Sequence, residues 1–206
     1  MPLYVSGGRF RGRKLAAPAG LATRPSTGRM RNAVMNILGT SVAGASVLDL
    51  YAGTGASGIE AMSRGARRVL FVENARPALA ALDRNIETLS LGPELAGVVR
   101  RDVLSLLRGG VPLEGAPFDL VYCDPPHEVF RDPHRADALR AALGAFALGG
   151  SLREGATLVI EHPAGKGFAT PPPGTKLIDQ RAYSAAGVSL FRAMGKPSIP
   201  PSGDAH

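Results

Sequence analysis

The chain has 206 residues, of which 45% are hydrophobic and 20% are charged, and it has a single cysteine, Cys123. These values are typical of one ordinary globular domain, and a single cysteine excludes a disulfide framework and any multi-cysteine metal site. No apolar run is long enough for a transmembrane span, and the first residues lack the apolar core of a secretory signal. The sequence therefore predicts a cytoplasmic protein with no membrane segment and no bound metal.

The positive charge is concentrated at one end of the chain. Lys and Arg number 24 against 17 Asp and Glu, which gives a net charge of +7. The first 48 residues contain seven bases and no acid, so the other 17 bases balance the 17 acids. This segregation predicts an extension that binds a polyanion, with nucleic acid favoured over a basic tail that has no specific partner. The seven bases are Arg9, Arg11, Arg13, Lys14, Arg24, Arg29 and Arg31.

The basic extension, residues 1–40, is predicted to contain a hairpin followed by a helix. Residues 1–25 have short apolar steps broken by glycines, which is typical of a β-hairpin with a Gly-Gly turn. Three of the arginines have a period of two, so on a strand they would share one face: Arg9, Arg11 and Arg13. Residues 26–38 have apolar side chains at helical spacing, which predicts a helix.

The body, residues 41–195, alternates apolar strands with amphipathic helices. Strands are predicted at residues 45–52, 67–73, 97–102, 118–126, 156–164, 175–183 and 187–194. Helices are predicted from the loop after the first strand to residue 65 and at residues 75–91, 103–110 and 132–150. This alternation predicts an α/β fold with a parallel sheet covered on both faces, closed by an antiparallel hairpin of the last two strands. Residues 196–206 are predicted to form a disordered tail.

A glycine-rich turn follows the first strand of the body and opens a helix, as nucleotide-binding turns do. Gly53, Gly55 and Gly58 match the GxGxxG pattern, in which glycines permit a tight turn and close approach of a ligand. Glu73 ends the next strand, twenty residues after Gly53, where a carboxylate can accept both hydroxyls of an adenosine ribose. The spacing predicts a cofactor that contains a nucleoside, and the alternative is a structural turn with a helix-capping acid.

Asp49 distinguishes between NAD and S-adenosylmethionine, two cofactors that bind to turns of this geometry. It lies four residues before Gly53, where a carboxylate would repel the phosphates of a dinucleotide. S-adenosylmethionine carries an ammonium and a sulfonium, for which an acid is favourable, so the sequence favours it over NAD. The alternative role for Asp49 is bonding within its own loop. Asp102, at the end of the third strand, is predicted to bind the exocyclic amine of adenine, with a helix N-cap as the alternative.

A second motif, Asp124, Pro125, Pro126 and His127, ends the fourth strand at the edge where open parallel sheets bind ligands. The prolines lack N–H donors, which leaves nearby carbonyls available to accept hydrogen bonds. Such a site suits an exocyclic amine on a planar base. Asp124 and the Pro125 carbonyl would hold its two protons while its lone pair faces a sulfonium methyl group, and His127 would stack on the base. This chemistry depends on positioning more than on strong base catalysis.

The body resembles the class I, Rossmann-like S-adenosylmethionine-dependent methyltransferases, whose seven-stranded sheet ends in an antiparallel hairpin. DPPH resembles the (D/N/S)PP(aromatic) motif of amino-group methyltransferases. Five segments together resemble the bacterial 16S rRNA guanine-N2 methyltransferases of the RsmD type: GGRFRGRKL, RPSTGRMRNAVMNIL, DLYAGTGASGIEAMSRGA, FVE and DPP. The resemblance covers roughly residues 4 to 194.

The resemblance implies methyl transfer from S-adenosylmethionine to the exocyclic N2 amine of one guanine in 16S rRNA. It implies that the seven bases of the extension bind this RNA in a small-subunit assembly particle. Nothing in the sequence demands more than a monomer or points to an obligate protein partner. The expected catalytic residues are Asp124, Pro125, Pro126 and His127. The expected cofactor residues are Asp49, Tyr51, Ala52, Gly53, Gly55, Ser57, Glu73, Asn74, Asp102 and Val103.

Three departures and two alternatives accompany the resemblance. His127 stands where the family usually has Phe or Tyr, and Gly28 and Asn32 stand where it more often has acids. One alternative is amino methylation of adenine or cytosine in DNA or another RNA. The other is an RNA-binding assembly factor with a vestigial cofactor site. Glu161 and His162, which end the fifth strand, are expected to be solvated or loop residues without a catalytic role.

Overall fold

The computed structural model describes residues 2–18, 25–110 and 113–195 of the chain. Arg24, one of the predicted RNA-binding residues, and the predicted tail at 196–206 lie outside the described residues. Within the described ranges, none of the helices combines the length and the apolar character that a membrane crossing requires.

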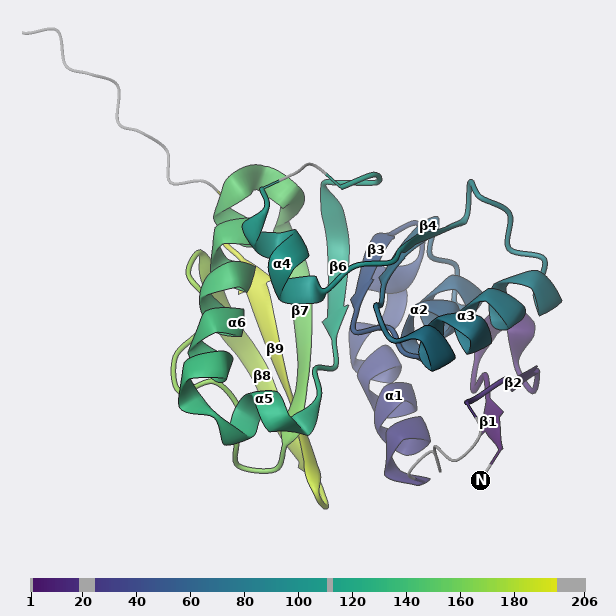
Figure 1. The fold of residues 1–206 in the computed structure, drawn as a ribbon, viewed down its shortest axis with the longest axis horizontal. Helices are drawn as coiled ribbons and strands as arrows, with labels where there is room; N and C mark the ends of the chain where they lie inside the picture. Colours follow the sequence, from purple (N-terminus) through teal and green to yellow (C-terminus); the bar gives the residue numbers. More distant parts are fainter. Residues whose placement is uncertain (1, 19–24, 111–112, 196–206) are drawn as a thin grey trace, which may run out of the picture.

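A seven-stranded sheet forms the centre of the molecule, as predicted (Figure 1). Its strands lie in the order β5-β4-β3-β6-β7-β9-β8, in which the first five are parallel and β9 runs antiparallel between β7 and β8. All five residues of β3 are buried, since a central parallel strand is covered on both faces. The strands are β3 Ser46–Leu50, β4 Arg68–Val72, β5 Ala96–Val99, β6 Phe118–Cys123, β7 Leu152–Pro163, β8 Thr175–Tyr183 and β9 Ala186–Ala193.

Two layers of helices enclose the sheet (Figure 1). One layer packs on the side chains of Val47, Phe71 and Tyr122, and it contains α1 Pro25–Leu38, α2 Ala56–Ser63 and α3 Arg76–Thr88. The other packs on alternate residues such as Leu48 and Leu50, and it contains α4 Val103–Arg108, α5 His127–Arg131 and α6 Pro133–Phe146. Because the strand side chains alternate between faces, odd-numbered residues of β3 and even-numbered residues of β6 point toward α1.

The extension contains the predicted antiparallel hairpin and helix, but the turn of the hairpin differs from the prediction. Two short strands, β1 Leu3–Tyr4 and β2 Lys14–Leu15, pair antiparallel, but the chain between them includes a 3-10 turn at Gly8–Phe10. The predicted Gly-Gly hairpin turn is therefore wrong, as is the strand that would have placed three arginines on one face. The reason is tertiary. The amide of Phe10 donates to Ser63 Oγ at 2.9 Å, and Gly8, at φ 72°, lies so close to the backbone of α2 that a side chain there would collide with it.

A buried acid, Glu60 of α2, joins the extension to the body. It is 0% exposed, and the Ser6 backbone amide and hydroxyl donate to its carboxylate at 2.8 and 2.7 Å. Arg64 Nε donates to the same carboxylate at 3.0 Å, and Arg31 Nε lies 3.7 Å from it. One carboxylate therefore holds the loop of the extension, α1 and the end of α2 together.

Replacing Glu60 with glutamine is expected to lower the free energy of unfolding by about 2–3 kcal/mol, because two buried or half-buried arginines lose their shared countercharge. Urea denaturation would measure the change. Asp83→Asn is the matched control: it removes the half-exposed ion pair with Arg100 and should cost less than about 1 kcal/mol. Equal effects from the two substitutions would contradict a central role for Glu60.

Candidate active site

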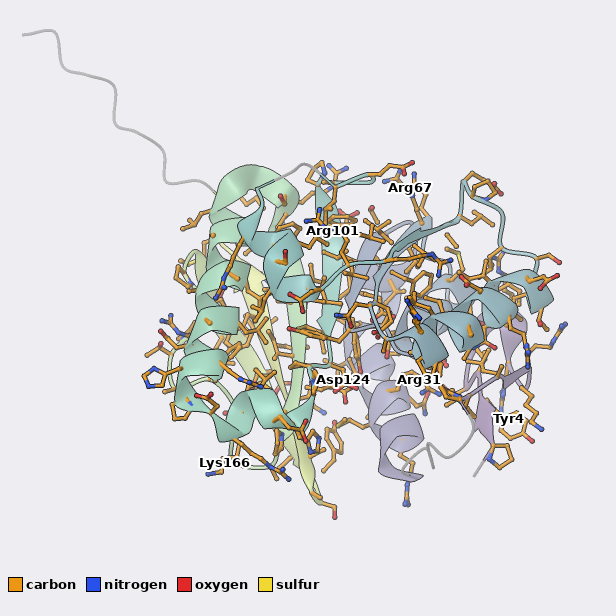
Figure 2. All side chains as sticks on the ribbon, in the orientation of Figure 1. Tyr4, Arg31, Arg67, Arg101, Asp124 and Lys166 are labelled. Atoms are coloured by element: carbon orange, nitrogen blue, oxygen red, sulfur yellow. The ribbon has the colours of Figure 1, made fainter. Side chains whose placement is uncertain are left out.

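Three acids lie in a row at the carboxyl ends of three adjacent strands. Asp49 is in β3, Asp124 follows β6, and Glu161 is in β7. The pairing of Asp49 with Tyr122, and of Cys123 with Ile160, puts the three side chains at neighbouring positions on the face that α1 covers. Figure 2 labels Asp124 at this end of the sheet. Like charges in a row raise one another's pKa, so this edge of the sheet is built to receive positive charge.

The loop after β3 is held in unusual backbone conformations. Tyr51 has φ 58°, a left-handed value that costs a non-glycine residue free energy. Gly53 and Gly55 also have positive φ, 57° and 78°, and Gly55 precedes the first turn of α2. A Cβ on Gly55 would collide with Leu82 and Phe71, so this glycine serves close packing, whereas Gly53 lines a cavity. The predicted glycine-rich loop after the first strand of the body is present. Glycine is needed for close packing at Gly55, whereas Gly53 lies at the cavity.

Asp49 both bonds its own loop and faces a cavity. Its carboxylate accepts from the Gly58 amide at 2.8 Å, and the residue is only 2% exposed. Burial raises the pKa of Asp49 to about 8, although the hydrogen bond from Gly58 opposes the shift. Asp49 therefore bonds its own loop and also lines the smaller cavity, so the loop bond leaves its cofactor role as a prediction.

Glu73 and Asp102, the acids predicted to hold an adenosine, make backbone contacts of their own. Glu73 accepts from the Gly53 amide at 2.8 Å and from the Asn74 and Ala75 amides at 2.7 and 2.8 Å. Asp102 caps α4 by accepting from the Ser105 amide at 2.8 Å. Both still line the larger cavity. A carboxylate has about four acceptor positions, so these bonds fix the side chains without exhausting them.

Two cavities meet at the row of acids. The larger, of about 750 Å³, is lined by both groups of predicted residues, among them Glu73, Asn74, Asp102, Asp124, Pro125, Pro126 and His127. The smaller, of about 170 Å³, is lined by Asp49, Ala52, Gly53 and Ser57 together with Arg31. Tyr51, Asp124 and Glu161 line both. Among the predicted cofactor residues, Val103 has its side chain in the core and Gly55 faces inward, and neither lines these two cavities.

The DPP motif connects β6 to the short helix α5, which the sequence did not predict. Pro126 precedes the first residue of α5, His127, and its carbonyl accepts from the Val129 amide at 2.9 Å. The turn is tied to β3 as well, because the Asp124 amide donates to the Leu50 carbonyl at 3.4 Å. The prolines and these two bonds hold Asp124 and Pro125 at the cavity wall.

Two residues of β7 contribute to the site although they were not expected there from the sequence. Glu161 is 6% exposed and accepts from the Tyr122 hydroxyl, and burial and the charge of Asp124 raise its pKa. His162 is buried too, and its ring contacts Ser189 Oγ and the Pro163 carbonyl, each at 2.9 Å. The prediction that both are solvated or loop residues is wrong. A signal existed, because Glu161 ends a strand that pairs with β6 and therefore lies at the same edge as Asp124.

The predicted RNA-binding residues fall into two groups. Five of them have exposed side chains: Arg9, Arg11, Arg13, Lys14 and Arg29. Arg9 lies over the ring of Phe10 at 4.4 Å, and Arg13 donates to the Thr88 carbonyl at 3.3 Å. Arg31, in contrast, is 4% exposed and lies inside the molecule, where Glu60 and the Tyr4 carbonyl contact it. The charge count therefore included one cation that the outer surface does not present.

A parallel sheet of this strand order, closed by an antiparallel hairpin, with a glycine loop and a DPP turn at adjacent strand ends, is the architecture of the class I methyltransferases. The predicted fold class is confirmed. The family model described as "Conserved hypothetical protein 95" matches residues 3–192, so the chain belongs to that family.

Individual relatives support the same assignment. The chain is 30% identical over 190 residues to "Ribosomal RNA small subunit methyltransferase D" of Escherichia coli (strain K12), which covers 92% of this chain and 89% of that protein. It is also 30% identical over 193 residues to "Putative rRNA methyltransferase YlbH" of Bacillus subtilis, covering 94% and 100%. The solved structure "Putative methyltransferase yhhF from Escherichia coli" superposes with a TM-score of 0.78 at 29% identity, covering 94% and 99%. The resemblance to RsmD-type methyltransferases is confirmed.

Proposed function

We propose that this chain transfers a methyl group from S-adenosylmethionine to the exocyclic N2 amine of a guanine in 16S rRNA. The observation that carries the proposal is the position of Asp124 and Pro125, which line the larger cavity beside the row of acids. A carboxylate and a carbonyl at one point of a cavity wall form an acceptor pair, and an amine with two N–H groups is its complement. The names of the relatives support ribosomal RNA as the substrate.

The residues of the two cavities fit S-adenosylmethionine. Asp49, Asp124 and Glu161 surround the smaller cavity, which suits a group that carries an ammonium and a sulfonium. Glu73 and Asp102 lie on the wall of the larger cavity, where they can accept from a ribose and an adenine. When bound, this cofactor supplies an electrophilic methyl group.

The chain's own residues provide orientation. The Asp124 carboxylate and the Pro125 carbonyl each accept a hydrogen bond from one N–H of the amine, and this turns its lone pair toward the smaller cavity. As the amine gains a methyl group it loses a proton, which passes to the Asp124 carboxylate and then to water. His127, at the first position of α5, lines the same cavity and offers an imidazole face to a planar base.

The extension is proposed to hold the RNA. Its five exposed cations can neutralise phosphates, while Arg31 does not face the outer surface. We propose a small-subunit assembly particle in the cytoplasm as the substrate and a monomer as the active species.

Transfer of labelled methyl groups to 30S particles, taken from cells that lack the activity, tests the proposal. We expect incorporation into 16S rRNA, and nucleoside digestion should identify N2-methylguanosine. Methylated adenine or cytosine as the product would favour the amino methyltransferases of other nucleic acids. No incorporation, together with no cofactor binding, would favour an assembly factor with a vestigial site.

Cofactor affinity is expected to rise with pH between about 6 and 7.5. In the unliganded protein, burial holds the Asp49 pKa at about 8, so its carboxyl is mostly protonated below that pH. A cationic cofactor favours the carboxylate, so binding releases a proton and the affinity rises by up to about tenfold per pH unit. Calorimetric titration with S-adenosylmethionine in buffers of different ionisation enthalpy measures the release. Asp49→Asn should reduce the pH dependence, and Glu161, whose pKa is raised as well, accounts for what remains. A wild-type affinity that is flat over this range would contradict a protonated Asp49.

A further inference from the structure

Arg31 lies at the wall shared by the extension and the smaller cavity. It projects from α1, and Figure 2 labels it between Tyr4 and Asp124. The guanidinium is 4% exposed, and its Nη2 donates to the Tyr4 carbonyl at 2.9 Å. Its Nε is buried and has no hydrogen-bond partner among the described residues. A buried donor without an acceptor is costly, so this nitrogen calls for an acceptor that the protein does not supply.

Glu60 forms an ion pair with Arg31 but no hydrogen bond to its Nε. Its carboxylate already accepts from Ser6 and from Arg64 at 2.7 to 3.0 Å, whereas Arg31 Nε lies at 3.7 Å, beyond hydrogen-bond distance. Arg64 alone gives Glu60 a bonded countercharge. Arg31 is therefore a second cation beside Glu60, and it also lines the smaller cavity.

Arg31 also lines the smaller cavity, and among the described residues it is the one basic residue of that lining. The remaining charged residues of the lining are the acids Asp49, Asp124 and Glu161. The charge of Arg31 reaches Asp49 and Glu161, since it lowers the pKa of both against the stronger effect of burial. A cavity lined by three acids and a guanidinium is complementary to a zwitterion, an ammonium on one carbon with a carboxylate beside it.

We infer that Arg31 binds the carboxylate of the methionyl group of the cofactor. The inference rests on the proposed function, because the ligand is the one proposed there. Guanidinium and carboxylate match in geometry, and Arg31 lines the cavity while its Nη2 stays on Tyr4. The residue that the charge pattern assigned to RNA thus becomes part of the cofactor site, and the extension contributes to that site through the contact of β1 with Arg31.

The test compares S-adenosylmethionine with its decarboxylated form, which keeps the ammonium and the sulfonium and lacks only the carboxylate. Equilibrium binding of both is measured for the wild type and for Arg31→Gln. We expect the wild type to prefer S-adenosylmethionine by about 30-fold or more, and Arg31→Gln to lose most of this preference. Arg31→Lys should restore part of it, since the charge remains without the planar fork. Arg64→Gln, which also removes a cation from Glu60 but does not line the cavity, should keep the full preference.

Each outcome of this test separates the role of Arg31 from the proposed function. If the wild type binds neither compound, the proposed cofactor is wrong. If the wild type binds both without preference, or if Arg31→Gln keeps the preference, the role of Arg31 is overturned and the proposed function stands. If Arg31→Gln weakens both compounds equally, Arg31 has only a structural role, which thermal unfolding of the same variant would show as a lowered Tm.

Discussion

Asp124→Ala is expected to lower kcat for methyl transfer by about 10³-fold while cofactor affinity stays within about tenfold of the wild type. Alanine removes one of the two acceptors that turn the amine toward the smaller cavity. The kcat of Asp124→Asn should lie between those of the wild type and Asp124→Ala. Its amide oxygen can still accept a hydrogen bond from the amine, but it cannot take up a proton. Single-turnover methylation of 16S rRNA particles and equilibrium cofactor binding measure the two effects separately.

Thermal stability is a second measurement on the same Asp124 variants. The charge of Asp124 raises the pKa of Asp49 and of Glu161, so it opposes the ionisation of both neighbours. Removing it relieves repulsion in the row of acids, and Tm should stay level or rise. Asp137→Asn, on the exposed side of α6, is the control for loss of one acid and should leave kcat unchanged. A fall in Tm and in cofactor binding together would assign Asp124 a folding role instead.

Much of the fold could be predicted because its signals are local. The strands of the body are apolar runs bounded by glycine, proline or acid, and their alternation with helices determines a parallel sheet. The edge β-hairpin, Thr175–Tyr183 and Ala186–Ala193, was predicted to within a residue of its bounds. The glycine loop and the DPP turn were predicted for the same reason, since each follows a strand directly and lies at the carboxyl edge.

The residues whose positions were predicted wrongly are held in place by contacts between distant parts of the chain. Arg9 was expected on a strand, but Ser63 and the backbone of α2 draw the neighbouring residues into a 3-10 turn. Arg31 was expected to bind RNA, because a count of charges carries no information on which side chains are buried. Its burial depends on α2 and β1, which the sequence could not place against α1. The left-handed Tyr51 gave no sequence signal at all, since strain in a loop is set by the structure around it.

Removing the four exposed cations near β2, with alanine at Arg9, Arg11, Arg13 and Lys14, is expected to weaken RNA binding by about 10³-fold at 0.1 M salt. Each phosphate contact contributes about 0.7 to 0.9 to the slope of log affinity against log salt, so the slope should become shallower by about 3. Filter binding to 16S rRNA across a range of salt concentrations measures both. Cofactor affinity should not change, because none of the four lines either cavity.

These substitutions are a cleaner test than deleting the extension, since Leu3, Val5 and Leu15 belong to the core and Ser6 bonds Glu60. The control removes the same charge elsewhere, with alanine at the exposed Arg108, Arg135, Arg153 and Lys176. If binding depends on net charge alone, both variants will weaken it equally. If the extension is the binding surface, only the first will change the slope, because counterions are released where phosphates are contacted. Equal slopes for the two variants would contradict the division between a neutral catalytic body and a basic RNA-binding extension.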